Sequence, residues 1–166
     1  MNKLTVLAKA MIDYYRNDPK RINHFIKVHA FAKEIGQLES LDEETLFILE
    51  TAAYVHDIGI KNSELKYGSS AGKYQEIEGP AEAEKLLSQL GFDKRVINRV
   101  SYLVGHHHTY DRVDGEDYRI LIEADFIVNA YEDCMSRESI ENVRSKIFRT
   151  KSGTEILDTL FPCTEE

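Results

Sequence analysis

The stretch AAYVHDIGI at residues 52–60 constrains the fold most strongly, because an apolar run ends there in an adjacent histidine and aspartate. At about 100° per residue, Leu49 and Ala53 lie on the same side of a helix as His56. His56 is therefore expected to point into the core at the end of a buried helix, with Asp57 beside it. A buried, ionised aspartate is costly unless it is paired or bound to a metal. From these residues alone, a helix end with a capping histidine and a solvated Asp57 is an equal alternative.

Other residues of metal-binding type lie on apolar helical faces elsewhere in the chain. His24 shares a helical stripe with apolar residues, and Asp125 lies within the apolar run 121–128. A single inward histidine is usually a hydrogen-bonded core residue, whereas two inward histidines and two inward aspartates form an N2O2 set suited to a divalent metal. The members of this set are His24, His56, Asp57 and Asp125. His29 lies about 140° around the helix from His24 and is expected to be structural.

The order of these residues on apolar helices, followed by a His-His pair, resembles the HD-domain superfamily of metal-dependent phosphohydrolases. The resemblance covers roughly residues 20–130, most of the chain. It implies an all-α fold, here a bundle of about seven helices, around a mono- or dinuclear metal site that usually hydrolyses phosphate esters. It does not name a substrate. We expect a single HD-type domain over residues 1–166, with the motif core at about 20–130 and packing helices at about 135–161.

Composition and net charge limit the classes of molecule that the chain is expected to bind. The chain of 166 residues has a net charge of −8 and a pI near 5.3, which argues against binding of long nucleic acids or a membrane surface. A small phosphorylated substrate remains compatible, since a bound cation reverses the local field. Cys134 and Cys163 are far apart and resemble free thiols, and neither a membrane span nor a signal peptide is expected. We therefore expect a cytoplasmic location, with a homo-oligomer left open.

Residues 60–79 change character, because glycine and serine interrupt every helical period. They are expected to form a long connection from the His-Asp pair to a helix at about 80–90. Lys61 and Lys73 are candidates to bind substrate by neutralising phosphate oxygens, and neighbouring tyrosines are candidates to stack on a base. For each lysine, a solvated surface position is an equal alternative.

The residue at position 75 bears on the number of cations. Dinuclear members of the superfamily usually have a histidine four residues before the glycine that opens the next helix, and here that position is Gln75. Glutamine is a poor metal ligand, so one cation per chain is expected. Glu76 and Glu78 are candidates to replace the missing histidine or to orient a water, and Glu78 is assigned to substrate binding. An exposed, solvated glutamate is the default alternative for both.

The triplet His106-His107-His108 ends an amphipathic run at about 93–107. Helical phase carries His107 onto the apolar side and points His106 away, although phase is unreliable at a helix end. By the resemblance, two consecutive histidines here serve a second metal or contact substrate phosphate. His106 and His107 are assigned to substrate binding, and His108 is expected to face solvent. Asn129, one turn after Asp125, is placed to hydrogen-bond a ligand residue.

Together the residues and the resemblance predict a phosphohydrolase with one divalent transition metal, Mn, Fe, Co, Ni or Zn, with Mg also suitable. Asp57 is the candidate to accept a proton from water, and His107 is the candidate to hold phosphate or protonate the leaving group. The expected substrate is a small phosphate ester such as a nucleotide or sugar phosphate. Two alternatives stay open, a di-iron oxygenase and a nucleotide-binding module without turnover. Gln75 argues against the first, and the complete ligand set argues against the second.

Overall fold

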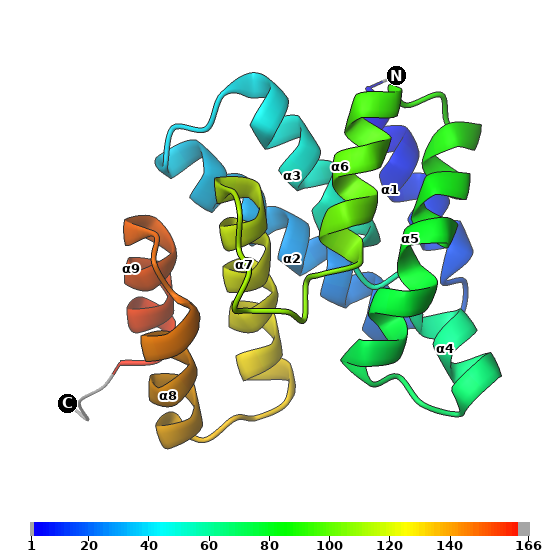
Figure 1. The fold of residues 1–166 in the computed structure, drawn as a ribbon. Helices are drawn as coiled ribbons and strands as arrows, with labels where there is room; N and C mark the ends of the chain where they lie inside the picture. The colour runs from blue at the N-terminus through cyan, green and yellow to red at the C-terminus, as the bar shows by residue number, and fades with distance from the viewer. Residues whose placement is uncertain (1, 163–166) are drawn as a thin grey trace.

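A computed structural model describes residues 2–162, and all regular secondary structure in this range is helical (Figure 1). The predicted all-α fold is confirmed. The expected number of about seven helices is too low, chiefly because a helix lies where a connection was expected. The nine helices of the described residues are α1 (Lys3–Tyr14), α2 (Pro19–Leu38), α3 (Glu43–Val55), α4 (Ile60–Tyr67), α5 (Gly72–Gln89), α6 (Lys94–Val104), α7 (Glu116–Glu132), α8 (Arg137–Ile147) and α9 (Lys151–Leu160).

Helix α3 lies in the middle of the bundle and packs on α1, α2, α6 and α7. Every residue of α3 from 48 to 55 is buried. Helix α7 packs on α2 and α3, and α8 and α9 lie beyond it, at the left of Figure 1. Helix α5 packs on α4 and α6 on the opposite side. The carboxyl end of α3 is therefore enclosed by neighbouring helices, and the His-Asp pair follows at that point.

Short polar side chains set the starts of the helices on both sides of the site. Asp18 accepts a hydrogen bond from the backbone N–H of Arg21, and Pro19 occupies the first position of α2, where no N–H is needed. Asp42 caps α3 by accepting from the backbone N–H groups of the next turn. Ser40 has a left-handed φ of 60° and lies in the preceding turn.

The segment 60–79 is mostly helical, contrary to the long connection expected from its glycines and serines. Helix α4 ends at Gly68, whose left-handed φ of 63° suits a C-terminal cap. Helix α5 starts at Gly72, so Pro80 lies inside it rather than at its start. Gly59 and Gly79 explain why a connection was expected, because these glycines allow close packing of the backbone and do not form turns of a loop. A Cβ on Gly59 would lie 2.7 Å from the backbone nitrogen of Gly79, so only glycine permits this close approach.

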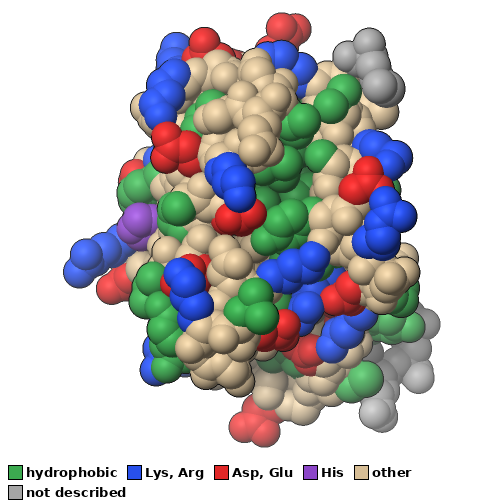
Figure 2. All heavy atoms as spheres, turned by 90° about the vertical axis from the view of Figure 1, so that its right-hand side faces the viewer, with side chains coloured by type: hydrophobic (Ala, Val, Ile, Leu, Met, Phe, Trp, Pro, Cys, Tyr) green, Lys and Arg blue, Asp and Glu red, His purple; other side chains and the backbone are tan. Residues whose placement is uncertain are grey.

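Figure 2 views the molecule from the right-hand side of Figure 1 and shows basic and acidic side chains interspersed on that face. None of the described helices combines the length and the apolar composition that a membrane span requires. Cys134 is exposed and carries a free thiol. Cys163, also expected as a free thiol, lies outside the described residues.

Candidate metal centre

The end of α3 delivers His56 into the interior. His56 is fully buried, and its Nδ1–H donates to the carbonyl oxygen of Ala53 at 2.8 Å. A carbonyl only accepts, so this bond assigns the proton to Nδ1 and leaves Nε2 free to face the neighbouring helices. The hydroxyl of Tyr15 donates to the backbone oxygen of Asp57 at 2.7 Å, which holds the turn after α3 in place.

Four side chains from three parts of the fold converge on one point. His24 Nε2 from α2 lies 3.2 Å from His56 Nε2 and 3.1 Å from Asp125 Oδ1, which α7 provides. Asp57 Oδ2 lies 3.4 Å from His24 Nε2 and 3.5 Å from His56 Nε2. His56 Nε2 lies 3.4 Å from Asp125 Oδ1. The structure thus brings together all four residues that the sequence suggested as metal ligands, and their role as ligands stays a prediction.

The spacing of these atoms fits a single cation. Ligands at about 2.1 Å from a metal lie about 3.0 Å apart at right angles and about 3.4 Å apart at tetrahedral angles. Five of the six pairs among the four donor atoms are separated by 3.1–3.5 Å, within this geometry to a few tenths of an ångström. Two imidazole nitrogens and two carboxylate oxygens are also a donor set that divalent transition metals accept. The residues present therefore fit the cation that the fold family implies.

The charges of the cluster perturb one another. Burial opposes charge on His24, but Asp125 and Asp57 raise its pKa to about 9. Burial likewise opposes charge on His56, and the same two carboxylates raise its pKa. Burial also opposes ionisation of Asp57 and Asp125, yet the neighbouring histidines lower the pKa of both carboxyl groups. Without a cation the cluster holds ionised carboxylates against protonated imidazoles, so a divalent cation would displace protons on binding.

A second group of donors adjoins the first and shares Asp57. Asp57, His107 and His108 each place a potential ligand atom within 4.8 Å of the others. His107 Nδ1–H donates to Val104, and His107 Nε2 lies 3.5 Å from Asp57 Oδ1. His107 Nε2 is one of two buried side-chain polar atoms among the described residues that have no hydrogen-bond partner. An unsatisfied buried nitrogen aimed at a carboxylate is an arrangement that a cation or a substrate oxygen would complete.

A cavity of roughly 360 Å³ opens onto the cluster. Lys20 and Arg21, in the first turn of α2, contribute its cationic side chains, and Asp18, Glu132 and Asp133 add carboxylates beyond the cluster itself. The volume lies at the small end of the range for small-molecule sites. The excess of carboxylates means that an anionic ligand needs a cation in the cavity to offset their repulsion.

The comparison with protein families agrees with this geometry. The profile of the family described as HD domain matches residues 21–140, a range that contains all four clustered residues. The chain belongs to the HD-domain family. This result confirms the family predicted from the order of the histidines and aspartates.

A solved structure extends the similarity of this HD domain to most of its length. The chain is similar to the crystal structure, at 1.45 Å, of a predicted HD superfamily hydrolase from an uncultured Thermotogales bacterium. The two share 27% sequence identity with a TM-score of 0.63, over 95% of this chain and 82% of the other. No curated protein sequence matched the chain.

Of the three histidines at 106–108 in this HD domain, His107 points inward and is fully buried, as helical phase predicts, whereas His106 and His108 differ from the roles assigned to them. His106 stacks on Tyr102 at 4.2 Å and bonds to the Tyr102 carbonyl oxygen, and it does not line the cavity. His108, expected to face solvent, lines the cavity instead. Helix α6 ends at Val104, so His108 lies in a turn beyond it and helical phase does not give its direction. The assignment of His106 to substrate binding stays a prediction that this geometry does not support, and His108 is the member of the triplet that lines the cavity.

Neighbouring residues hold His108 in position. A Cβ on Gly72 would lie 2.6 Å from the His108 ring, so glycine makes room for the imidazole. His108 Nε2 lies 3.3 Å from Gln75 Oε1, and the Gln75 amide donates to the carbonyl oxygen of Ser70. Glu76, considered as a substitute ligand, accepts from the backbone N–H of His108 and so fixes the turn. Burial and His107 lower the pKa of His108 to about 4, so the ring is neutral at physiological pH.

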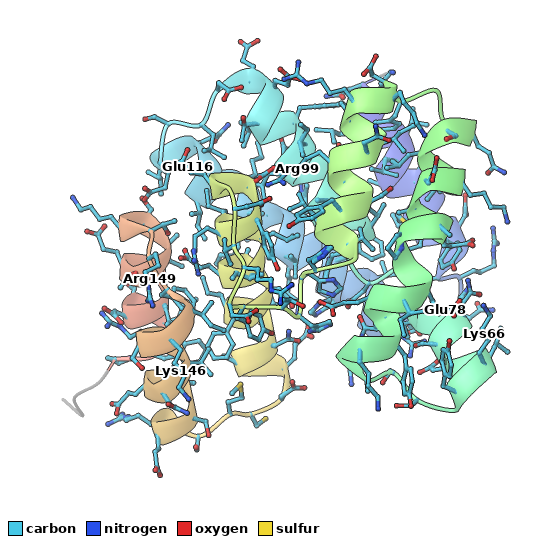
Figure 3. The ribbon with its side chains drawn as sticks, viewed as in Figure 1. Lys66, Glu78, Arg99, Glu116, Lys146 and Arg149 are labelled. Carbon is cyan, nitrogen blue, oxygen red and sulfur yellow. The ribbon has the colours of Figure 1, made fainter. Side chains whose placement is uncertain are left out.

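The substrate-binding residues expected in 60–79 point elsewhere. Lys61 Nζ donates to the backbone oxygen of Tyr14, and Lys73 lies over the ring of Tyr74. Glu78 accepts from Lys66 Nζ at 2.6 Å and from the hydroxyl of Tyr67, and Figure 3 shows Lys66 and Glu78 close together on α4 and α5. None of Lys61, Lys73 and Glu78 lines the cavity, so this geometry does not support their assignment to substrate binding, which stays a prediction.

The tyrosines of the same segment are also engaged within the protein. Tyr67 and Tyr74 stack on each other with ring centroids 4.2 Å apart, so neither ring offers a face in the cavity to a base. The lysines of the segment are engaged in the same way, Lys61 with Tyr14 of α1, Lys66 with Glu78 and Lys73 with Tyr74.

The two cationic side chains that line the cavity were not predicted from the sequence. Lys20 and Arg21 lie four and three residues before His24 on the same helix, and this spacing places side chains on one face. Helical spacing from His24 could therefore have identified them. Arg21 is held by Asp18 at 3.0 Å and by Glu64 at 2.5 Å. Glu132 was also missed, although it follows Asp125 by two turns on α7.

Proposed function

We propose that this protein is a metal-dependent phosphohydrolase that acts on a small phosphate ester. The observation that carries the proposal is the four-atom cluster, the set of donor atoms of His24, His56, Asp57 and Asp125, in which five of the six pairs lie 3.1–3.5 Å apart beside a cavity. His24, His56, Asp57 and Asp125 would hold the cation, with Mn, Fe, Co, Ni or Zn as candidates and Mg also suitable. Such a cation supplies Lewis-acid chemistry, which lowers the pKa of water and stabilises charge on a phosphoryl group.

The charges around the cavity support a phosphorylated substrate of limited size. Lys20 and Arg21 lie at the cavity on the side of α2, where they would bind phosphate oxygens or a second anionic group. The remaining charged residues of the cavity are acidic, which disfavours a polyanion that needs many simultaneous cationic contacts. Nucleoside monophosphates and sugar phosphates are the substrate classes that fit this combination.

Asp57 and His107 are the proposed catalytic residues. Asp57 presents one oxygen to the four-atom cluster and the other to His107, so it can bind a cation and also accept a proton from water. His107 donates from Nδ1 to the carbonyl oxygen of Val104, which leaves Nε2 directed at the site. When protonated, Nε2 would donate to a phosphate oxygen or to the leaving group.

The test is phosphate release by purified protein that has been stripped of metal and reloaded with Mn²⁺. The substrates are nucleoside monophosphates, sugar phosphates and p-nitrophenyl phosphate. We expect turnover of at least one, and we expect Asp125→Asn to lower it by more than about 100-fold, because a ligand is lost. Asp133→Asn is the matched control, since Asp133 lines the same cavity outside the cluster. Absence of phosphate release with every metal, or full activity of Asp125→Asn, would refute the proposal.

The second donor group favours one other function, that of an HD-type oxygenase with two irons. Asp57, His107 and His108 supply donors for a second cation that shares the Asp57 carboxylate. The same protein loaded anaerobically with Fe²⁺ and then exposed to air distinguishes the two functions. Consumption of O2 that depends on substrate and on His107 would favour the oxygenase. Phosphate release without O2 would favour the hydrolase.

A further inference from the structure

Glu132 lies behind the metal ligand His24, on the side away from the four-atom cluster. It is the last residue of α7 and follows Asp125 by seven residues, so both side chains lie on the same face of that helix. Glu132 Oε2 lies 2.8 Å from His24 Nδ1, while His24 Nε2 faces Asp125 at 3.1 Å. The Glu132 side chain is only 15% exposed. The two nitrogens of one imidazole therefore contact two carboxylates of the same helix.

The contact determines which nitrogen of His24 carries the proton. Asp125 Oδ1 lies beside Nε2, so the contact decides the tautomer once a cation has displaced the proton of Nε2. In that neutral ring the lone pair lies on Nε2, and Nδ1 keeps the hydrogen that the ionised carboxylate of Glu132 accepts. His56 and His107 obtain the same arrangement from backbone carbonyls, those of Ala53 and Val104. His24 obtains it from a charged group. An anionic acceptor strengthens the hydrogen bond and raises the basicity of the opposite nitrogen more than a neutral carbonyl does.

Lys27 holds the same carboxylate from the other side. Its Nζ lies 2.5 Å from Glu132 Oε1, and it follows His24 by three residues on α2. Both oxygens of Glu132 therefore bind residues of α2, and its rotamer is restrained at two points. A purely structural explanation is that Glu132 and Lys27 form an ion pair that joins the end of α7 to α2. The test below separates this explanation from a role that acts through His24.

We propose that Glu132 is a positioning residue for the metal centre, holding His24 in the Nδ1–H tautomer and orientation that present Nε2 as a ligand. The inference rests on the metal centre of the proposed function. It predicts that loss of Glu132 weakens metal binding although Glu132 itself is not a ligand. Groups that hydrogen-bond the ring nitrogen of a metal-binding histidine on the side away from the metal typically contribute 10- to 100-fold to metal affinity.

The experiment measures the Kd of Zn²⁺ for the full chain by competition with a chromophoric chelator. We expect Glu132→Ala to raise the Kd by about 10- to 100-fold. Glu132→Gln keeps the shape and a carbonyl acceptor but removes the charge, so it should lie between the alanine variant and the wild type. Asp133→Asn is the matched control, because it removes a carboxylate from the same cavity without touching His24. The control should leave the Kd within about twofold of the wild type, since a single exposed charge contributes little.

Two further measurements exclude a merely structural role. Thermal unfolding of the metal-free variants reports on the ion pair that joins α7 to α2. Lys27→Met should lower the unfolding midpoint by breaking this ion pair, but it should not weaken zinc binding as Glu132→Ala does. The ¹⁵N shifts of the His24 ring in the zinc-loaded protein report its tautomer, and Nδ1 should be protonated in the wild type.

The outcomes separate this inference from the metal centre itself. If the wild-type chain binds no zinc, the metal centre is refuted and this inference with it. If the wild type binds zinc and Glu132→Ala binds it equally well, the inference alone is refuted. An equal loss in Asp133→Asn and Glu132→Ala would also refute it, because cavity charge rather than the bond to His24 would then set the affinity.

Discussion

Asp57 faces two groups of donors with its two carboxylate oxygens, and His107 lies on the second side. Asp57 Oδ2 lies 3.4 Å from His24 Nε2, whereas Asp57 Oδ1 lies 3.5 Å from His107 Nε2. The two groups are unequal. The first contains four donors, of which five of the six pairs lie 3.1–3.5 Å apart, and the second contains three, one of them shared. Gln75 Oε1 lies beside His108, where a further imidazole would complete the second group.

This inequality predicts one tightly bound cation and a second that binds more weakly. Titration of metal-free protein with Mn²⁺, followed by electron paramagnetic resonance, should therefore show two phases. His107→Ala should remove the weak phase and keep the tight one. Gln75→His should strengthen the weak phase, because it replaces a poor ligand with an imidazole. Two equally tight phases in the wild type would contradict the prediction of one principal cation per chain.

Metal-free protein should lose stability between about pH 6.5 and pH 9. The pKa of His24 is about 9 in the folded chain, above its ordinary value of 6.5. The protonated ring therefore stabilises the fold fully below pH 6.5, and this contribution disappears as the pH rises through 9. The difference corresponds to roughly 3 kcal/mol at most. Zinc affinity should change in the opposite direction and rise over the same interval, because fewer protons compete with the metal.

Chemical denaturation of metal-free protein at several pH values, in the presence of a chelator, measures this effect. His24→Asn is the control, since it removes one titrating ring and should reduce the pH dependence to the part that His56 contributes. Wild-type and His24→Asn proteins with parallel pH profiles would show that His24 does not carry the effect.

Lys20, rather than the lysines of α4 and α5, should contribute to substrate binding. Lys20 lines the cavity, whereas Lys73 packs over Tyr74 outside it. Lys20→Ala should raise KM by roughly two- to fivefold with little change in kcat, as expected for an exposed ion pair worth up to about 1 kcal/mol. Lys73→Ala should leave both constants unchanged. Steady-state kinetics on the best substrate would decide, and the reverse ranking of the two variants would reinstate the sequence-based assignment.

Helical phase explains how much of the site could be predicted. His24, His56 and Asp125 lie within or at the end of long apolar helices, so their inward direction follows from a period of 3.6 residues. His108 follows the end of α6, where the chain turns and the period no longer applies. Its direction depends on the tertiary contact with Gly72, which local sequence does not encode, whereas His106 stacks on Tyr102, one turn earlier in the chain.

The secondary structure of residues 60–79, which follow the His-Asp pair, was predicted wrongly for a related reason. Glycine is typical of both turns and close helix packing, and only the three-dimensional contacts distinguish the two. Gly68 ends α4 with a left-handed φ, as expected for a turn. Gly59 and Gly79 instead lie against each other where the start of α4 meets α5. The sequence patterns of these glycines are alike, so the helices between them were assigned to a loop.

The contact between Gly59 and Gly79 leads to a final prediction about stability. A Cβ on residue 59 would lie 2.7 Å from both the backbone oxygen of Gln75 and the backbone nitrogen of Gly79. These atoms belong to α5 and cannot move independently, so Gly59→Ala should destabilise the fold by about 1–3 kcal/mol. Gly68→Asn is the control, since a Cβ there meets nothing within 4 Å and asparagine tolerates a left-handed φ. Thermal unfolding should show a lowered midpoint for Gly59→Ala alone, by roughly 2–4 °C for each kcal/mol. An unchanged midpoint would mean that α5 can shift away from α4 at no cost, and that Gly79 of α5 does not restrain the turn that carries Asp57.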